Sequence, residues 1–294
     1  MSRPGYYSRR ACDGKRRRGA AAKKIAARRW KPRYNAGARA RAHWRPRGRK
    51  LRDGTNRGAA MQELPIDRYF LDRAKAKRGG RLNAYASLTP SRTALVVVDM
   101  QDYFVKDGMP STIAEGQGIV ANINRLAAAT RAAGGLVVWI QTEAPADADD
   151  WANRREATSA ERWESRRELL ARDGEGFGIF PACAVESEDQ LATKIRYSAF
   201  IPYPSQLDTL LRDRGMDTLL IAGVATSTCC ESTARDASMW GYRTIMVSDA
   251  NADQTEALHR HTLGKFLTTF GDVQTTGQLT EKLAMGAELA VPAQ

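Results

Sequence analysis

Three polar residues follow or begin predicted structural elements, and together they could perform nucleophilic catalysis. Cys229 opens an amphipathic helix just after the apolar run 217–223. Free backbone N–H groups and the helix dipole at such a junction favour a thiolate, so we expect a reactive thiol with a lowered pKa. Asp99 follows a second apolar run and could accept the thiol proton. Lys194 could supply a positive charge beside both groups.

Each of these residues also has a simpler interpretation. A buried cysteine is commonly an inert apolar residue, the aspartate could cap a strand end, and the lysine could be a solvated charge. Asp102 and Arg196 are the nearby alternatives for the acid and the cation. Cys230 is the alternative thiol, but a rotation of about 100° per helical residue turns it away from the opening that Cys229 faces.

Apolar runs and glycines alternate along residues 92–285 in a pattern typical of a parallel α/β sheet. Continuous apolar runs, which indicate strands buried on both faces, occur at 94–100, 136–142, 217–223 and 242–249. Helical periodicity separates these runs, and glycines end the helices. The pattern predicts a three-layer α/β/α fold with a doubly wound sheet, which binds ligands at the carboxyl ends of its strands. Residues 143–190 interrupt the rhythm, and we interpret them as a lid or insertion.

The positive charge of the chain is concentrated at one end. The 294 residues have a formal net charge of +13, but residues 1–60 contain 21 Lys/Arg and two Asp/Glu, so the remainder is mildly acidic. We expect residues 1–60 to be a disordered Arg-rich tail and residues 61–91 to lead into the folded domain. The tail could bind nucleic acid or another polyanion, act as a targeting presequence, or be upstream sequence added by a start placed before Met61.

Other features of the composition narrow the class of protein. No run of 18 apolar residues occurs, so we expect no membrane span. Four cysteines are too few for a disulfide framework in a chain of this length, and a reducing cytoplasm is the simplest compartment.

Three segments resemble one known family. VVVDMQ, TKIRYSAF and GVATSTCCESTARDA, in that order, are similar to the isochorismatase-like cysteine hydrolases over about residues 92–280. The resemblance implies a Rossmann-like, mainly parallel sheet of six strands. It also implies an Asp-Lys-Cys triad at Asp99, Lys194 and Cys229, and a cis peptide bond between Val224 and Ala225.

Differences within this family separate the possible activities. Its nicotinamidases hold a metal ion through an Asp and two closely spaced histidines. Here His259 and His261 are two residues apart and would not share a helix face, so we expect no metal ion and no cofactor. True isochorismatases cleave a vinyl ether and lack the nucleophilic cysteine that Cys229 would supply. The chain is most similar to the metal-free amidase branch, which includes ureidoacrylate, biuret and N-carbamoyl amino acid hydrolases.

The resulting hypothesis is a hydrolase that cleaves a C–N bond of a small amide or ureido compound through a thioester. We expect the backbone N–H groups of Ala225 and Cys229 to form an oxyanion hole. The candidate substrate contacts are Phe104, Gln141, Tyr197 and Thr228. Ser227 stands where many relatives have asparagine, which changes the detailed shape of the site.

The sequence is also compatible with two other functions. One is a different small-molecule hydrolase of the same fold, of the isochorismatase or nicotinamidase/pyrazinamidase type. The other is a non-catalytic polyanion-binding protein that keeps a hydrolase fold beneath its basic tail. The resemblance also implies a homo-oligomer, either a dimer or a tetramer.

Overall fold

The computed structural model describes residues 64–144, 151–202 and 205–290. The predicted tail, residues 1–60, lies outside these ranges. The described strands are β1 (Thr93–Val98), β2 (Leu136–Thr142), β3 (Gln190–Lys194), β4 (Thr218–Val224), β5 (Arg243–Ala252) and β6 (Asp272–Gln274). They form one six-stranded sheet in the order β3-β2-β1-β4-β5-β6, with every pair of neighbours parallel. The predicted doubly wound α/β fold is confirmed.

The sheet separates two hydrophobic cores, because successive side chains of a strand point to opposite faces. Val96 and Val98 pack into the core beneath α1 (Arg68–Lys77), α6 (Leu207–Asp213), α7 (Glu231–Met239) and α8 (Glu256–Thr269). Leu95 and Val97 face the other core, under α3 (Val120–Ala132) and α9 (Thr276–Ala290). All six residues of β1 are buried, which is why its sequence is a continuous apolar run without alternation.

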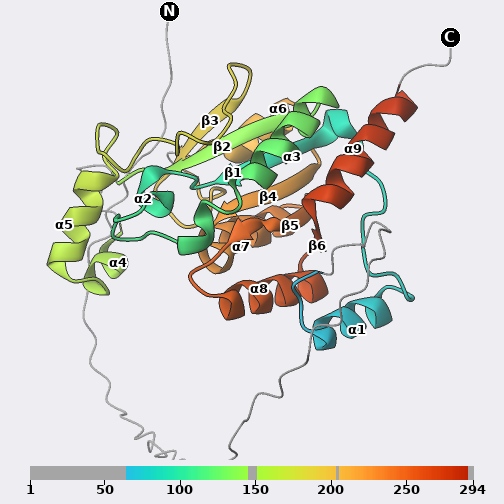
Figure 1. The fold of residues 1–294 in the computed structure, drawn as a ribbon, viewed down its shortest axis with the longest axis horizontal. Helices are drawn as coiled ribbons and strands as arrows, with labels where there is room; N and C mark the ends of the chain where they lie inside the picture. The colour runs from blue at the N-terminus through green and yellow to red at the C-terminus, as the bar shows by residue number, and fades with distance from the viewer. Residues whose placement is uncertain (1–63, 145–150, 203–204, 291–294) are drawn as a thin grey trace, which may run out of the picture. The chain divides into compact units, whose positions relative to one another are not determined.

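The helices α1 and α9 lie at the two ends of the described chain and complete these cores. The α1 helix packs against α8 (Figure 1). Arg78, just after α1, donates hydrogen bonds to the carbonyl oxygens of Leu267 and Gly271, both at 2.7 Å, and forms an ion pair with Asp272 at 3.3 Å. The residues before the first strand are therefore tied to the edge of the sheet at β6.

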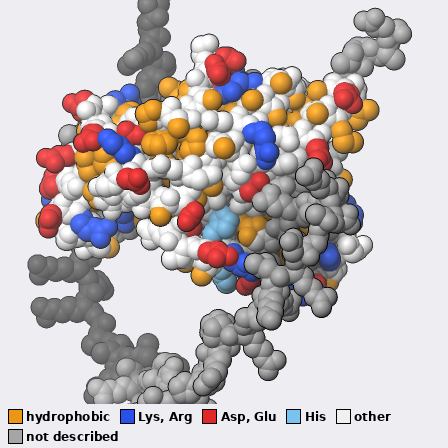
Figure 2. Space-filling view, in the orientation of Figure 1, with side chains coloured by type: hydrophobic (Ala, Val, Ile, Leu, Met, Phe, Trp, Pro, Cys, Tyr) orange, Lys and Arg blue, Asp and Glu red, His pale blue; other side chains and the backbone are white. Residues whose placement is uncertain are grey.

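Residues 143–190, which interrupt the regular pattern of strands and helices, contain two short helices between β2 and β3. These are α4 (Ala152–Glu156) and α5 (Ala160–Leu169). They lie together at one end of the molecule, beside α2 (Asp102–Val105) (Figure 1). Side chains of both charge signs cover the outer surface at this end (Figure 2). The remaining elements are the 3₁₀ turns η1 (Pro90–Arg92) and η2 (Ala114–Gly116) and the π-helical turn η3 (Thr226–Cys230). Among the described helices, none has the length and apolar character needed to cross a bilayer.

Candidate active site

Four neighbouring strands contribute one polar side chain each to a cluster at the carboxyl edge of the sheet. Lys194 is the last residue of β3, Thr142 is the last residue of β2, and Asp99 follows β1. Cys229 lies in η3, the turn that follows β4. Because these strands are adjacent and parallel, their carboxyl ends meet at one edge, and residues that are up to 130 positions apart in the sequence come into contact.

Asp99 is buried, with 1% of its surface exposed, and its carboxylate has two defined neighbours. The Oδ2 atom lies 2.8 Å from Nζ of Lys194, and the Oδ1 atom accepts a hydrogen bond of 2.9 Å from the Thr142 hydroxyl. The backbone of Asp99 has a φ of 55°, in the left-handed region, which aspartate tolerates better than most residues. This conformation ends β1, and the Asp99 side chain lies in the site directly after the strand.

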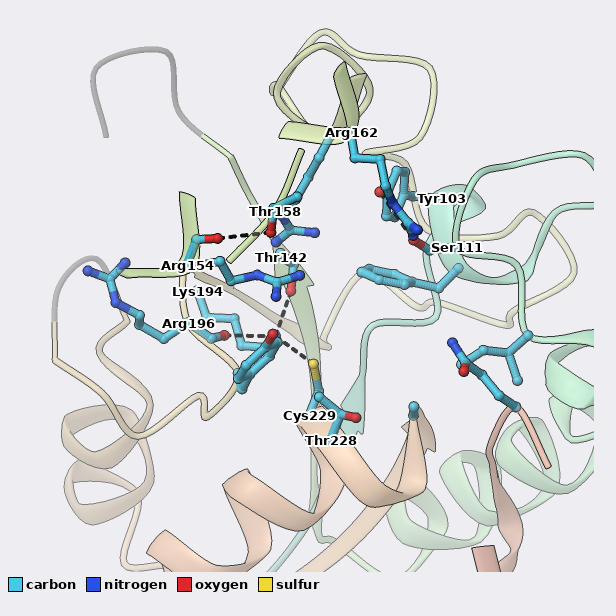
Figure 3. Close-up of a pocket in the computed structure, with 16 residues that line it drawn as sticks. Tyr103, Ser111, Thr142, Arg154, Thr158, Arg162, Lys194, Arg196, Thr228 and Cys229 are labelled. Atoms are coloured by element: carbon cyan, nitrogen blue, oxygen red, sulfur yellow. Dashed lines mark hydrogen bonds between the residues drawn. The ribbon is translucent and has the colours of Figure 1, made fainter. Parts of the chain in front are cut away.

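Lys194 is also 1% exposed, and its ammonium group donates to several acceptors (Figure 3). Nζ lies 2.5 Å from the Thr142 hydroxyl oxygen, 3.1 Å from the Arg196 carbonyl oxygen and 3.5 Å from Sγ of Cys229. Burial alone would lower the pKa of this ammonium, but its electrostatic and hydrogen-bond interactions with Asp99 and Cys229 more than offset that effect and raise the pKa above its ordinary value. Lys194 is therefore a fixed cation between the carboxylate and the sulfur.

The surroundings of the Cys229 thiol disfavour its ionised form. Burial raises its pKa to about 12; the charge of Lys194 lowers the pKa, but Asp99 opposes that effect. Burial therefore opposes the thiolate that a helix N-terminus was expected to favour. The physical reason is desolvation, since only 8% of the Cys229 surface is exposed, and removal from water disfavours a charged sulfur.

Cys230 has different surroundings, as predicted. It is completely buried, and its sulfur lies 3.9 Å from the Ala222 carbonyl oxygen, on the side of the sheet rather than of the cavity. Burial raises the pKa of the Cys230 thiol well above its ordinary value. Of these two adjacent cysteines, only Cys229 lines the cavity described below.

The η3 turn is a π-helical turn in which the carbonyl oxygen of Ala225 accepts hydrogen bonds from two backbone N–H groups. Those of Thr228 and Cys230 lie 3.1 Å and 3.2 Å away, and the Ser227 N–H donates instead to Asp253 Oδ2 at 2.6 Å. The peptide bond between Val224 and Ala225 is cis, as the resemblance implied. The backbone that carries Cys229 is thus fixed by hydrogen bonds within the turn and by the hydrogen bond to Asp253, which follows β5.

His259 supports the same turn. Its Nε2 atom lies 3.1 Å from the Ser248 carbonyl oxygen, and its Nδ1 atom lies 2.8 Å from the Thr226 hydroxyl. Because a carbonyl oxygen can only accept, Nε2 carries a proton, and in a neutral ring Nδ1 then accepts from the Thr226 hydroxyl. Burial lowers the pKa of His259, which favours the neutral ring. His261 instead packs edge-on against the Phe70 ring, with the ring centres 5.6 Å apart.

The side chains of His259 and His261 therefore lie in different surroundings. Within the described ranges, no three His, Cys, Asp or Glu side chains are grouped in a way that could hold a metal ion.

Gly223 allows the ends of β1 and β4 to approach each other. Its φ is +112°, and a Cβ atom at this position would lie 2.0 Å from the Val98 carbonyl oxygen. Any side chain would force apart the two strands that deliver Asp99 and Cys229. The glycine is required by strand packing, in addition to any role of the following loop toward a substrate.

A cavity of about 270 Å³ opens above Cys229 and Lys194. It is lined by Tyr103, Phe104, Ser111, Ile113, Thr142, Arg154, Thr158, Arg162, Arg166, Lys194, Arg196, Tyr197, Ala225, Thr228, Cys229 and Gln254. Three of the four candidate substrate contacts, Phe104, Tyr197 and Thr228, are among them. The fourth, Gln141, is not, and its amide donates to the Phe177 carbonyl oxygen at 3.0 Å.

The difference between Gln141 and its neighbour follows from strand geometry. Consecutive residues of a strand point to opposite faces, so Thr142, one position later, is the residue whose side chain reaches the site. Gln101 holds that residue in place, because its amide accepts from the Thr142 N–H at 2.7 Å and donates to the Thr142 carbonyl oxygen at 3.0 Å. A polar residue ending a buried strand next to β1 is the sequence signal that would have identified Thr142.

Asp102 and Arg196, the alternative acid and cation, do not take the places of Asp99 and Lys194 in the site. Asp102 begins α2 and does not line the cavity. Arg196 contributes its backbone carbonyl to Lys194, while its guanidinium turns away from the sulfur (Figure 3) and stacks on Trp151, 4.8 Å from the ring centre.

Comparisons with known proteins agree with this fold. Residues 93–278 match the isochorismatase domain. A ureidoacrylate amidohydrolase, RutB, from Methylobacterium radiotolerans is 33% identical over 225 residues, covering 69% of this chain and 86% of the relative. Among solved structures, a cysteine hydrolase from Pseudomonas syringae pv. phaseolicola is 30% identical, with a TM-score of 0.64, over 70% of this chain and 98% of that one. An N-carbamoylsarcosine amidase from Thermoplasma acidophilum is 25% identical, with a TM-score of 0.52, over 63% and 96%.

Proposed function

The chain belongs to the isochorismatase family of hydrolases, and from that premise we propose that it is a cysteine hydrolase of C–N bonds in small amide or ureido compounds. The observation that carries the proposal is the contact of Lys194 Nζ with both Asp99 Oδ2, at 2.8 Å, and Cys229 Sγ, at 3.5 Å, at the base of the cavity. The names of the similar amidohydrolase and amidase support the choice of C–N bonds.

The first step begins with a neutral thiol. Asp99 takes the proton of Cys229 as the sulfur attacks the carbonyl carbon, so the thiolate exists only while the S–C bond forms. A resting thiol pKa of about 12 is compatible with this order of events, because the base lies beside the sulfur. Lys194 forms an ion pair with the carboxylate and offsets the negative charge that develops on sulfur.

The oxyanion of the tetrahedral intermediate accepts hydrogen bonds from the backbone N–H groups of Ala225 and Cys229, because both residues line the cavity. Protonated Asp99 then gives its proton to the leaving nitrogen, the C–N bond breaks, and ammonia or an amine departs. A thioester to Cys229 remains.

The second half of the cycle regenerates the thiol. Asp99 removes a proton from a water molecule as that water attacks the thioester carbon. When the C–S bond breaks, the proton returns from Asp99 to sulfur, and the product leaves as the acid. Every proton taken by Asp99 is thus returned, and no other reactant than water is needed.

An ammonia-release screen tests the proposal. It covers ureido compounds, N-carbamoyl amino acids and primary amides, with Cys229→Ala as the blank. We expect release by the wild-type protein and none by Cys229→Ala, with nearly normal release by Cys230→Ala, whose sulfur lies in the core. Equal loss in the two cysteine variants would contradict the assigned nucleophile. Release that persists in Cys229→Ala would reject the mechanism.

A further inference from the structure

His259 does not line the catalytic cavity, but it contacts the turn that carries both proposed oxyanion donors. Its Nδ1 atom lies 2.8 Å from the hydroxyl oxygen of Thr226, a residue with no exposed surface. Thr226 directly follows Ala225 and lies three residues before Cys229. A shift of Thr226 would therefore displace the backbone N–H groups on both sides of it.

The contact between His259 and Thr226 has a direction, because the other ring nitrogen has a partner of known type. Nε2 lies 3.1 Å from the Ser248 carbonyl oxygen, which can only accept. In a neutral ring Nε2 therefore holds the single proton, and Nδ1 accepts from the Thr226 hydroxyl. A second proton on the ring would occupy Nδ1. The buried Thr226 hydroxyl could then no longer donate to the ring, and the turn would lose the stabilisation of that hydrogen bond.

The groups around His259 influence its protonation in opposite directions. Burial has the largest effect and lowers the pKa of the ring, and the charge of Arg260, which is paired with Asp67 at 2.7 Å, also lowers it. The groups that raise the pKa are the Ser248 carbonyl oxygen, Asp253 and Glu256. The ring is partly exposed, so it can exchange a proton with solvent. It lines a second cavity of about 500 Å³, whose lining also includes Glu115, Asp253 and Glu256.

From this arrangement we infer that His259 is a positioning residue, which holds the oxyanion donors in place through Thr226 while Nδ1 carries no proton, so that acidification slows catalysis by removing this contact. The inference rests on the proposed function, because it assigns a pH control to that same site. A second contact holds the turn independently of this proton, since Asp253 accepts from the Ser227 N–H at 2.6 Å. Protonation of His259 should therefore loosen the turn and leave the protein folded.

Two substitutions of His259 separate the two hydrogen bonds of its ring. His259→Asn places an amide oxygen where Nδ1 lies, so it keeps an acceptor for the Thr226 hydroxyl and does not titrate. His259→Gln places an amide N–H near the position of Nε2, so it keeps only the donor to the Ser248 carbonyl oxygen. At about pH 8 we expect His259→Asn to retain most of the wild-type kcat and His259→Gln to lose roughly 2- to 10-fold, the effect of one hydrogen bond.

The pH profile of kcat, measured with the best substrate of the ammonia-release screen, is the main test. Below the ordinary histidine pKa of about 6.5, the wild-type protein should lose the same factor of roughly 2 to 10 as His259 gains its second proton. This loss should be absent from His259→Asn. His261→Asn is the matched control on the same helix, and it should keep the wild-type profile because His261 packs against Phe70 instead. An unchanged acid loss in His259→Asn, or equal kcat values for His259→Asn and His259→Gln at pH 8, overturns the inference and leaves the proposed function standing.

A measurement without turnover separates the two proposals if no compound is hydrolysed. NMR titration gives the pKa of the His259 ring, whose signals are assigned by their loss in His259→Asn. A ring nitrogen that has lost its donor binds a proton more tightly, so Thr226→Val should raise the proton affinity of His259 roughly 2- to 10-fold. Thr226→Ser keeps the hydroxyl and should leave the pKa near the wild-type value. A raised pKa in Thr226→Val supports the proton-linked contact even though the proposed reaction has failed, and an unchanged or lowered pKa overturns the inference.

Discussion

Oδ2 of Asp99 lies 2.8 Å from Nζ of Lys194, and each of these side chains is only 1% exposed. Two opposite charges so deeply buried depend on each other, because the removal of one leaves the other without compensation. The pair comes from the ends of β1 and β3, which are separated in the sheet by β2. The same contact thus holds together the edge of the sheet and supplies the proposed base of the reaction.

Asp99→Asn should lower both turnover and stability. The amide keeps the size of the carboxylate and tolerates the positive φ, but it cannot accept the thiol proton. We expect kcat to fall by about 10²- to 10⁴-fold, the usual contribution of a general base. The unpaired Lys194 ammonium should cost about 3–5 kcal/mol of unfolding free energy, measured by urea denaturation.

The double variant Asp99→Asn/Lys194→Met is the control for this prediction. Because it removes both charges, it should recover much of the lost stability and none of the lost activity. If Asp99→Asn is as stable as the wild-type protein, the two charges do not stabilise each other as the geometry indicates.

Thr142→Val should slow catalysis without weakening substrate binding. The hydroxyl accepts from Lys194 and donates to Asp99, so its loss leaves a buried carboxylate oxygen without that donor. We expect kcat to fall roughly 10-fold or more with little change in KM, since one hydrogen bond to a charged group contributes about 1.5–3 kcal/mol. Thr142→Ser keeps the hydroxyl and should retain most of the activity. A matching loss in both variants would point to packing of the methyl group instead.

Alkylation of Cys229 by iodoacetamide should be slow at neutral pH. A pKa of about 12 leaves a very small thiolate fraction at pH 7, and that fraction increases about tenfold per pH unit. The rate should therefore keep rising beyond pH 9, where the rate of an ordinary thiol levels off. Peptide mapping is needed, because burial also raises the pKa of Cys183 to about 12. A plateau below pH 8 at Cys229 would show that the thiolate is stabilised after all.

The same shift predicts how stability depends on pH. The folded state holds the Cys229 proton more tightly than the unfolded chain, whose thiol has an ordinary pKa near 9. This contribution to the unfolding free energy is fully present below pH 9 and is lost as the pH rises toward about 12. Cys229→Ala should show a smaller decrease in the urea midpoint over the accessible part of this range than the wild-type protein does.

Gly223→Ala should unfold or inactivate the protein. The added methyl group would lie 2.0 Å from the Val98 carbonyl oxygen, and the φ of +112° is unfavourable for alanine. Gly178→Ala is a matched control, because a Cβ atom there would meet nothing within 4 Å and no positive φ is involved. Circular dichroism and thermal unfolding of the two variants compare the effects. A soluble, folded and active Gly223→Ala protein would contradict the close approach of β1 and β4.

Much of the fold was accessible from the sequence because its signals are local. A strand buried on both faces must be a continuous apolar run, and a helix that ends before such a strand commonly ends at a glycine, so the order of most elements could be predicted. Three helices escaped that pattern. The α1 helix carries mostly charged residues, and α4 and α5 lie in a region where polar side chains obscure the helical period.

In the candidate site, local sequence patterns predict some properties and not others. Residue type and position after a buried strand were enough to select Asp99 and Cys229, and strand alternation alone could have favoured Thr142 over Gln141. The state of the thiol could not be predicted in that way. A helix N-terminus favours a thiolate, but burial has the opposite effect, and burial depends on residues from other elements that close around the sulfur.

The sequence by itself determined which chemical groups this protein has at its strand ends, since those groups are set by residues within a few positions of one another. Only the tertiary structure decided which of these groups meet. Parallel strands bring Asp99, Thr142 and Lys194 to one edge of the sheet, and the helices between β2 and β3 turn Arg154, Arg162 and Arg166 into the same cavity. The physical reason is that distance and burial, which set charge interactions and pKa values, are properties of the packed chain and of no single segment.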